Sequence, residues 1–148
     1  NFKAYGVTNH RHTPEIEQEL SNLAGEDVLV SFTPHLMPVK RGMMCTSYLN
    51  LKDSGLDSEK LYDLYCEYYK EEFFVRVLKP GILPETKNVA GSNFIDISVN
   101  VDKRLNRAVI VSAIDNLGKG AASQAVQCLN IMLGLDEKTG LKYPAFYL

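Results

Sequence analysis

The feature that most constrains the fold of this 148-residue chain is a stretch in which apolar and polar residues alternate. The apolar positions are Ile95, Ile97, Val99 and Val101, and the polar positions are Asp96, Ser98, Asn100 and Asp102. A period of two residues is typical of a β-strand with one buried and one polar face. After a turn from Lys103 to Asn106, a second strand-forming segment runs from Arg107 to Ile114. The pattern therefore predicts a β-hairpin.

Other segments have the apolar spacing of amphipathic helices or the residue types of strands. Helices are predicted over residues 14–24 and 121–133. Between them, the residues at the spacing of another amphipathic helix are Leu61, Leu64, Tyr65, Tyr68 and Glu72. Further strands are predicted over residues 2–7, 28–33, 40–51 and 73–78. Thr13 is expected to cap the first helix and Gly25 to stop it, and Asp57 or Ser58 is expected to cap the second. Because strands and helices do not alternate strictly, we expect an α+β fold with a mixed, largely antiparallel sheet and helices packed on it.

The last helix is apolar over much of its circumference. Its stripe consists of Ala122, Ala125, Val126, Leu129, Met132 and Leu133, and Ala121 and Cys128 widen it. A helix of this kind usually packs on two sides, and a domain of this size does not readily provide both. We therefore expect a partner domain to cover it. The first residues, Asn1-Phe2-Lys3, lack an initiator Met, so we also expect the chain to be part of a longer protein.

Composition narrows the class of protein. With 45% hydrophobic and 23% charged residues, the chain is expected to form one globular domain over residues 1–148. A net charge of -2 argues against nucleic acid and membrane surfaces as partners. Cys45, Cys66 and Cys128 are odd in number and widely spaced, so we expect reduced thiols and a cytoplasmic location.

The segment His10-Arg11-His12-Thr13-Pro14-Glu15 is the densest group of reactive side chains. In an extended stretch, His10 and His12 project to the same side, so one imidazole can exchange protons with a substrate while the other, or Glu15, orients or binds it. Two other interpretations stay open. The first is a zinc site, but zinc normally takes three or four protein ligands, and only His10, His12 and Glu15 are available here, without paired cysteines. The second is a polar surface loop with capping residues, which is as well supported as catalysis.

Two further segments could contact a ligand. Arg41 at the start of a strand could bind a carboxylate or phosphate through two hydrogen bonds, although exposed basic residues are common. The segment from Gly118 to Ser123 partly matches a dinucleotide-binding fingerprint, and its backbone amides could contribute to an anion or cofactor site that another domain completes. The chain ends too soon afterwards for a self-contained Rossmann unit. Glycines that merely permit a turn explain the segment equally well.

Four segments in order carry a family resemblance over essentially the whole chain. They are HRHTPE (10–15), FTPHLMPVKRG (32–42), GSNFIDI (91–97) and DNLGKGAA (115–122). Together they resemble the N-acetyl-γ-glutamyl-phosphate reductases of arginine biosynthesis. The resemblance implies an NADPH-dependent enzyme that converts an acyl phosphate to N-acetyl-glutamate semialdehyde, with a cysteine nucleophile that follows an amino-terminal Rossmann domain. This chain contains neither of those parts.

The resemblance also implies roles for individual residues. It makes His10 or His12 the acid/base partner of the cysteine, and it places Arg11, Glu15 and Arg41 near the substrate. Asn116, Gly118, Lys119 and Gly120 would face NADPH, and no residue would bind a metal. The implied fold is that of the carboxy-terminal domain of glyceraldehyde-3-phosphate dehydrogenase, with a terminal helix over residues 120–134 that packs on the cofactor domain.

The resemblance further implies a homo-oligomer, either a dimer or a tetramer. The chain by itself is expected to be inactive. Two alternatives remain: a reductase of a related acyl phosphate, of the aspartyl or amino-adipyl type, and a non-catalytic dimerisation module.

Overall fold

A computed structural model describes residues 1–53 and 55–146 of the chain. It divides into two compact units, Asn1–Lys40 and Arg41–Leu148. Within the described residues, no helix is both long and apolar enough to cross a membrane.

The first unit contains a two-stranded antiparallel ladder and one helix. Strand β1 (Lys3–Ala4) pairs with β2 (His35–Leu36), and α1 spans Thr13–Ala24. The predicted stop at Gly25 is confirmed, because this residue has a φ of 71° and its N–H donates to the carbonyl of Ser21. The predicted N-cap is wrong, since Thr13 is the first helical residue and His12 holds the cap position.

The strand predicted over residues 28–33 is also wrong, because this segment is irregular. Its backbone donors bond to side chains of α1 instead of to a neighbouring strand. The Val28 N–H donates to Ser21 Oγ at 2.9 Å, and the Val30 N–H donates to Glu17 Oε1 at 3.1 Å. Its β-branched composition indicated a strand, but side-chain acceptors on the preceding helix decided the conformation.

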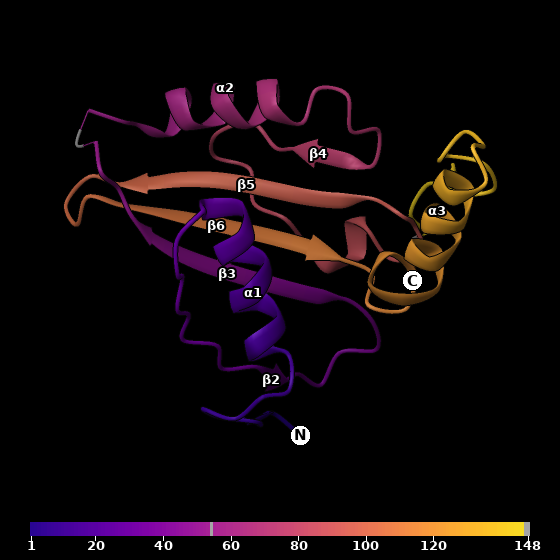
Figure 1. Ribbon diagram of the computed structural model, residues 1–148, viewed down its shortest axis with the longest axis horizontal. Coiled ribbons are helices and arrows are strands. Elements are labelled where there is room, and N and C mark those ends of the chain that lie inside the picture. The colour runs from indigo at the N-terminus through magenta and orange to yellow at the C-terminus, as the bar shows by residue number, and fades with distance from the viewer. Residues whose placement is uncertain (54, 147–148) are drawn as a thin grey trace. The chain divides into compact units, whose positions relative to one another are not determined.

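The second unit is built on a four-stranded sheet of order β3-β6-β5-β4 (Figure 1). Its strands are β3 (Met43–Asn50), β4 (Val75–Val77), β5 (Ile95–Asp102) and β6 (Arg107–Ile114). β4 and β5 are parallel, whereas β3 and β6, and β5 and β6, are antiparallel. The predicted α+β fold with a mixed, largely antiparallel sheet is confirmed. The strand expected over residues 73–78 is shorter than predicted, because it pairs with β5 over three residues.

The hairpin of β5 and β6 has the predicted bounds. Its register places Ile95 opposite Ile114 and Asp102 opposite Arg107. The expectation that its polar face is exposed is wrong in part, because Asp96 is 3% exposed and Ser98 is buried too. A buried carboxylate needs a partner, and Arg76 supplies one from β4, with its Nε 2.6 Å from Asp96 Oδ1.

Helix α2 (Ser58–Tyr68) lies along one face of the sheet (Figure 1). Of the two candidate caps, Asp57 and Ser58, the structure has Asp57, whose carboxylate accepts from the Lys60 N–H at 3.0 Å. Leu61 of this helix belongs to the hydrophobic core, together with Ile97, Val99 and Ala108 of the sheet. The helix therefore begins at its polar cap and is held by its apolar face.

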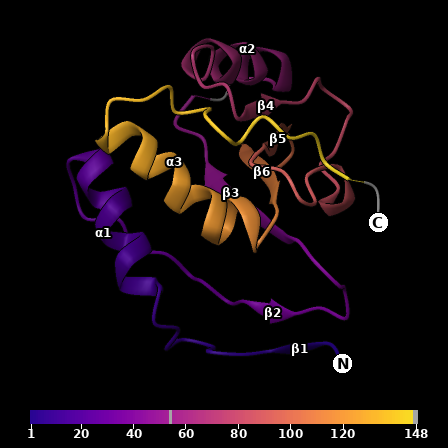
Figure 2. The same cartoon turned by 90° about the vertical axis from the view of Figure 1, so that its right-hand side faces the viewer.

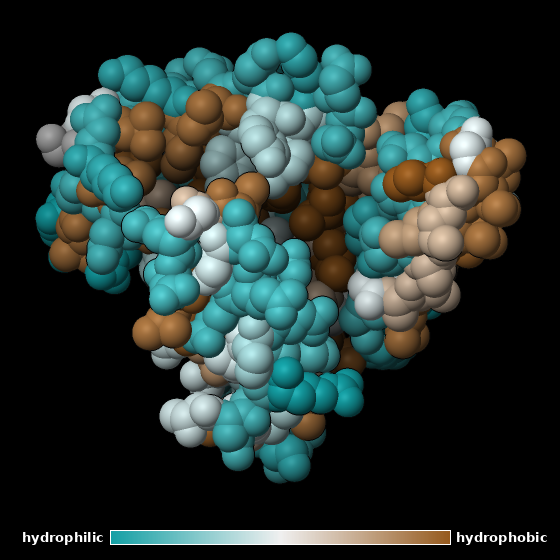
Figure 3. Space-filling model, in the orientation of Figure 1, coloured by the Kyte–Doolittle hydropathy of each residue, from teal (hydrophilic) through white to brown (hydrophobic). Residues whose placement is uncertain are grey.

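The last helix, α3 (Ser123–Met132), follows a π-helical turn, η2 (Gly118–Ala122), so it begins later and ends earlier than the predicted 120–134. Its buried residues are polar, Gln127 and Asn130, and its exposed ones are largely apolar. Figure 3 shows apolar side chains in brown gathered where α3 lies. The exposed ones in and around α3 are Leu117, Val126, Leu129, Ile131, Met132, Leu133 and Leu135.

The chain that connects β4 to β5 contains a short 3-10 helix, η1 (Thr86–Asn88), and ends in the turn at Gly91. The carboxy-terminal segment, yellow in Figure 2, returns across this unit. The Phe146 N–H donates to the carbonyl of Ala90 there, at 3.0 Å. The carboxy-terminal segment thus contacts the β4–β5 connection.

Candidate functional site

In the first unit, the two predicted histidines are in direct contact. The His10 and His12 ring centroids are 4.9 Å apart, and the His12 N–H donates to His10 Nδ1 at 3.2 Å. The His10 ring also makes T-shaped contacts with the rings of Tyr5 and Phe32, with ring centroids 5.3 and 5.2 Å apart. His10 is therefore half-buried and fixed in orientation, whereas His12 is exposed.

The local backbone makes room for this arrangement at Gly6. A Cβ at this position would lie 2.8 Å from Cδ2 of His10, and its φ of 57° is in the left-handed region. Arg11 and Glu15 are exposed, and Glu15 lies in the first turn of α1, where the helix dipole favours a negative charge. The four predicted residues of this segment thus lie together in one unit.

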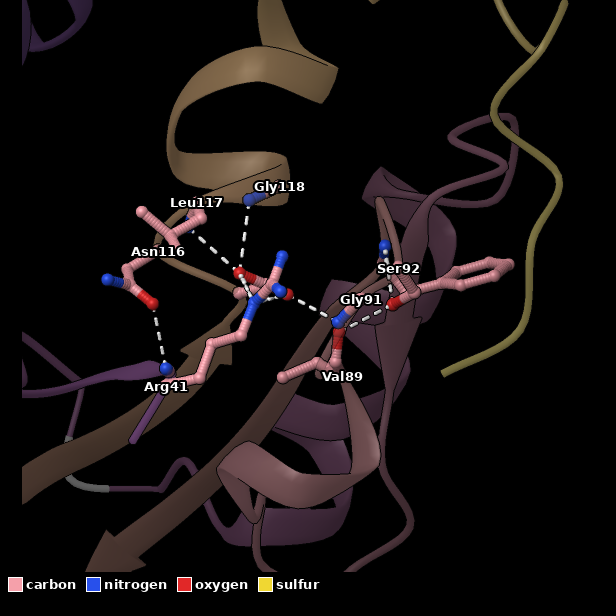
Figure 4. Close-up of polar contacts among 10 residues, drawn as sticks. Arg41, Val89, Gly91, Ser92, Asn116, Leu117 and Gly118 are labelled. Atoms are coloured by element: carbon pink, nitrogen blue, oxygen red, sulfur yellow. Dashed lines mark hydrogen bonds and ion pairs between the residues drawn. The ribbon is translucent and has the colours of Figure 1, made fainter. Parts of the chain in front are cut away.

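In the second unit, Arg41 bonds to an aspartate that follows β6 (Figure 4). Its Nε is 2.9 Å from Oδ1 and 2.7 Å from Oδ2 of Asp115. The Arg41 side chain is 28% exposed and that of Asp115 is 0% exposed. A buried charge without a partner is costly, so Arg41 compensates the buried Asp115 carboxylate where the start of β3 meets the end of β6.

Asp115 also accepts hydrogen bonds from three backbone N–H groups. Leu117 and Gly118 donate to Oδ1 at 2.8 and 3.0 Å, and Gly91 donates to Oδ2. Burial by itself would raise the pKa of this carboxyl, but Arg41 and the three N–H donors outweigh burial and lower the pKa below its ordinary value of 3.8. The carboxylate is therefore held in its ionised form.

Asn116 lies next to this carboxylate and is exposed. Its Oδ1 accepts from the Gly42 N–H at 2.8 Å, so the Arg41-Gly42 and Asp115-Asn116 pairs are joined twice. With Oδ1 engaged, the Nδ2 group of Asn116 remains a donor at an exposed position. Gly42 has a φ of 108°, which suits glycine, and Thr86 packs directly against it.

The predicted cofactor segment Gly118–Gly120 is the first part of the turn η2. The N–H groups of Leu117 and Gly118 are bonded to Asp115, and that of Gly120 donates to the Asp115 carbonyl at 2.9 Å. Backbone donors engaged inside the fold are not available to a phosphate group. This geometry does not favour these three amides as an anion site, and it leaves the Asn116 side chain as the better candidate for a cofactor contact.

The Lys119 side chain turns into the unit. Its Nζ donates to Gln127 Oε1 at 2.7 Å and lies 5.7 Å from the centre of the Phe74 ring. The same oxygen accepts from Asn93 Nδ2 at 2.8 Å, which links the lysine and α3 to the start of β5. Burial lowers the pKa of Lys119 below its ordinary value of 10.5.

The structure thus places the predicted residues in two groups. His10, Arg11, His12 and Glu15 belong to the first unit, and Arg41, Asn116, Gly118, Lys119 and Gly120 belong to the second. The residue at the centre of the second group, Asp115, was not among the predicted ones. A signal for it was present, since an Asp at the end of a strand, just before a glycine-containing turn, is a common acceptor for backbone N–H groups.

Within the described residues, His, Cys, Asp and Glu side chains form no group of three or more that could hold a metal ion. Cys45, Cys66 and Cys128 are free thiols, as expected.

Residues 1–116 match the family model described as semialdehyde dehydrogenase, dimerisation domain.

Among curated proteins, the chain is similar to N-acetyl-gamma-glutamyl-phosphate reductases. It is 69% identical to that of Acetivibrio thermocellus over 148 residues, which is 100% of this chain and 42% of the relative. It is 56% identical to that of Desulforudis audaxviator, over 99% of this chain and 42% of that relative. The chain therefore spans well under half the length of these relatives.

Among solved structures, the chain is similar in fold to aspartate semialdehyde dehydrogenase II from Vibrio cholerae. The TM-score is 0.67 at 17% sequence identity, and the match covers 84% of this chain and 37% of the other. The same enzyme in a complex with ASA matches with a TM-score of 0.66. At this identity, the likeness concerns the fold alone.

Proposed function

Because this chain belongs to the semialdehyde dehydrogenase family, we propose that it is the substrate-binding and dimerisation part of an NADPH-dependent reductase that converts N-acetyl-γ-glutamyl phosphate to N-acetyl-glutamate semialdehyde. The observation that carries this proposal is the 69% identity, over the whole chain, to the reductase of Acetivibrio thermocellus. In this proposal, the rest of the relatives' length supplies the Rossmann domain and the cysteine nucleophile.

The reaction needs a proton donor and acceptor beside that cysteine. We assign this role to the His10 and His12 pair. His10 is the better candidate because its ring is fixed by Tyr5, Phe32 and the His12 N–H. Since Nδ1 accepts a hydrogen bond, the neutral ring carries its proton on Nε2 and can donate it to an oxygen on which negative charge develops.

The substrate carries a phosphate and a carboxylate, and both need cationic or N–H donors. Arg41 and Arg11 are the candidate cations, and Glu15 is a candidate acceptor for the substrate amide. Arg41 is the better supported of the two cations, because its Nε is tied to Asp115 while its side chain is still partly exposed. Its guanidinium can therefore present its remaining donors in a constant direction.

The residues present fit a nicotinamide cofactor at Asn116. The exposed Nδ2 group can donate to the carboxamide oxygen of the ring, and the Gly42 N–H holds the other end of the same side chain. A bound NADPH would supply the hydride for the reduction. Gly118 and Gly120 act here by shaping the turn that carries Asn116, and Lys119 acts by anchoring that turn to Gln127.

Two exposed apolar surfaces fit the proposed partners. The apolar face of α3 would pack on the cofactor domain, because such a surface is normally covered. Strand β3 is an edge strand whose eight residues are all exposed, including Met43, Met44, Tyr48 and Leu49. A second copy of the chain would cover it in a homo-oligomer, either a dimer or a tetramer. The three free thiols support a reducing, cytoplasmic environment.

For the chain by itself, we propose dimerisation without catalysis as the second candidate function. The family description and the exposed β3 edge support it. It predicts self-association at micromolar concentration without binding of NADPH. A chain that remains monomeric, or that turns over substrate by itself, would contradict it.

The reductase activity can be tested with a chimera in which this chain replaces the matching 42% of the Acetivibrio thermocellus reductase. NADPH formation from N-acetyl-glutamate semialdehyde, phosphate and NADP⁺ is compared with the rates for aspartate semialdehyde, the amino-adipate analogue and NAD⁺. The proposal expects the N-acetyl-glutamate compound and NADP⁺ to be preferred. A folded chimera that prefers another semialdehyde would assign the chain to a related acyl-phosphate reductase.

A further inference from the structure

We propose that Asp115 is a positioning residue whose single buried carboxylate sets both the Arg41 guanidinium and the turn that carries Asn116. The inference rests on the proposed function, in which Arg41 meets an anionic group of the substrate and Asn116 meets the nicotinamide ring. It adds that one side chain aligns the two binding groups with each other.

The first step concerns the way in which Arg41 is held. Asp115 contacts it through Nε, at 2.9 and 2.7 Å from the two carboxylate oxygens, rather than through the end of the guanidinium. No hydrogen bond of the two Nη atoms is found among the residues that the structure describes. The Phe146 ring lies 5.7 Å from the guanidinium carbon and supports the side chain from one face. Two parallel donors on a fixed plane suit a carboxylate or phosphate.

The second step concerns the turn. The oxygen that accepts from Arg41 also accepts from the Leu117 and Gly118 N–H groups. A Cβ on Gly118 would lie 2.9 Å from the Ser92 carbonyl oxygen and 3.3 Å from Asp115 Cγ, so the turn is packed closely on the carboxylate. Asn116 lies between the two anchored positions, and its own Oδ1 is held by Gly42. Its amide direction therefore depends on the contacts of Asp115.

A second buried pair in the same unit shows what a purely structural role looks like. Arg76 Nε lies 2.6 Å from Asp96 Oδ1, and Arg76 Nη2 donates to the Asn88 carbonyl at 3.0 Å. This pair joins the parallel neighbours β4 and β5 at Arg76 and Asp96, which are opposite each other in register. Here both Nε and Nη2 of the guanidinium are engaged within the fold. Asp96 is therefore a matched control for Asp115.

The test uses the chimera with the Acetivibrio thermocellus reductase and the variants Asp115→Asn and Asp96→Asn. Both are expected to lower the melting temperature. Asp115→Asn is expected to raise the KM values for the semialdehyde and for NADP⁺ by about 10-fold or more each, as expected for charge-assisted contacts that lose their alignment. Asp96→Asn should leave both KM values within about two-fold. Two variants that lower stability equally and leave both KM values unchanged would overturn the inference.

Arg41→Lys provides a second readout if Asp115→Asn does not fold. A lysine keeps the charge, but its single ammonium group cannot bond to Asp115 and at the same time present two parallel donors to the substrate. The KM for the semialdehyde should therefore rise about as much as in Arg41→Ala, and a wild-type KM would overturn the inference. No turnover by the unsubstituted, folded chimera would overturn the proposed function and the inference with it. Turnover with unchanged KM values in these variants would overturn the inference alone.

Discussion

The Nε atom of Arg41 lies 2.7 Å from Oδ2 of Asp115, although 74 positions separate the two residues in the chain. The pair joins the start of β3 to the end of β6, and the Gly91 N–H adds the β4–β5 connection to the same carboxylate. Three segments that are far apart in the sequence thus bond to the same buried carboxylate.

Acid should destabilise the chain partly through Asp115. The pKa of Asp115 in the folded state lies below the ordinary value of 3.8. The contribution of this carboxylate to the free energy of unfolding is therefore fully present above pH 3.8, and it is lost as the pH falls through the folded-state pKa. We expect the free energy of unfolding, measured with urea between pH 6 and pH 3, to fall less steeply in Asp115→Asn than in the wild type. Parallel slopes below pH 4 would show that Asp115 does not carry this dependence.

Replacing Leu61 with Ala should destabilise the chain by about 2–4 kcal/mol, because this side chain fills the core between α2 and the sheet. Leu64 lies on the same helix but is 60% exposed, so Leu64→Ala should cost no more than about 0.5 kcal/mol. Urea midpoints of the two variants provide the comparison. Similar losses for both would mean that α2 is not held through Leu61.

Gly42→Ala and Gly81→Ala separate a steric clash from backbone strain. Both glycines have positive φ values, 108° and 88°, so both substitutions strain the backbone. At Gly42 the new Cβ would also lie 2.5 Å from Cβ of Thr86, whereas nothing lies within 4 Å at Gly81. We expect Gly42→Ala to cost about 1–2 kcal/mol more in thermal unfolding. A smaller loss at Gly42 than at Gly81 would rule out the close contact with Thr86.

The catalytic role of the histidine pair can be resolved in the chimera. His10→Ala should lower kcat about 10²- to 10⁴-fold, as expected for the loss of a general acid. His12→Ala should cost less, because its ring is exposed and contacts the His10 ring. His35→Ala is the control, since this residue stacks on Phe2 at 5.4 Å, away from the pair in sequence. A double variant of His10 and His12 with wild-type kcat would remove both from the mechanism.

Met132 tests whether the apolar face of α3 is a docking surface. It is 82% exposed, so Met132→Glu should change the stability of the chain by no more than about 0.5 kcal/mol. In the chimera, the same substitution would bury an unpaired charge against the cofactor domain, and the melting temperature should fall by several degrees. The same substitution in the chain by itself is therefore the control. If Met132→Glu changes the stability of the chain and of the chimera equally, the apolar face of α3 lies outside the domain interface.

Local patterns were sufficient for several elements. The alternation over residues 95–102 predicted β5 and its hairpin partner within the observed bounds, because a period of two defines a strand wherever one face is buried. Asp57 and Gly25 marked the beginning of α2 and the end of α1, because caps depend on residues within one helical turn. The histidine segment was predicted as a site in the same way, since its residues are neighbours in sequence.

Tertiary contacts decided the rest. Residues 28–33 have strand composition, but the acceptors for their N–H groups are side chains of α1. Helix α3 buries Gln127 and Asn130, because Lys119, Asn93 and the carbonyls of Glu137 and Thr139 offer partners there, and it leaves its apolar stripe exposed. The sequence by itself determined the hairpin, the stop of α1 at Gly25 and the family, whereas the N-cap expected at Thr13 was wrong. The role of Asp115 depended on the tertiary structure, because its partners come from positions far apart in the chain.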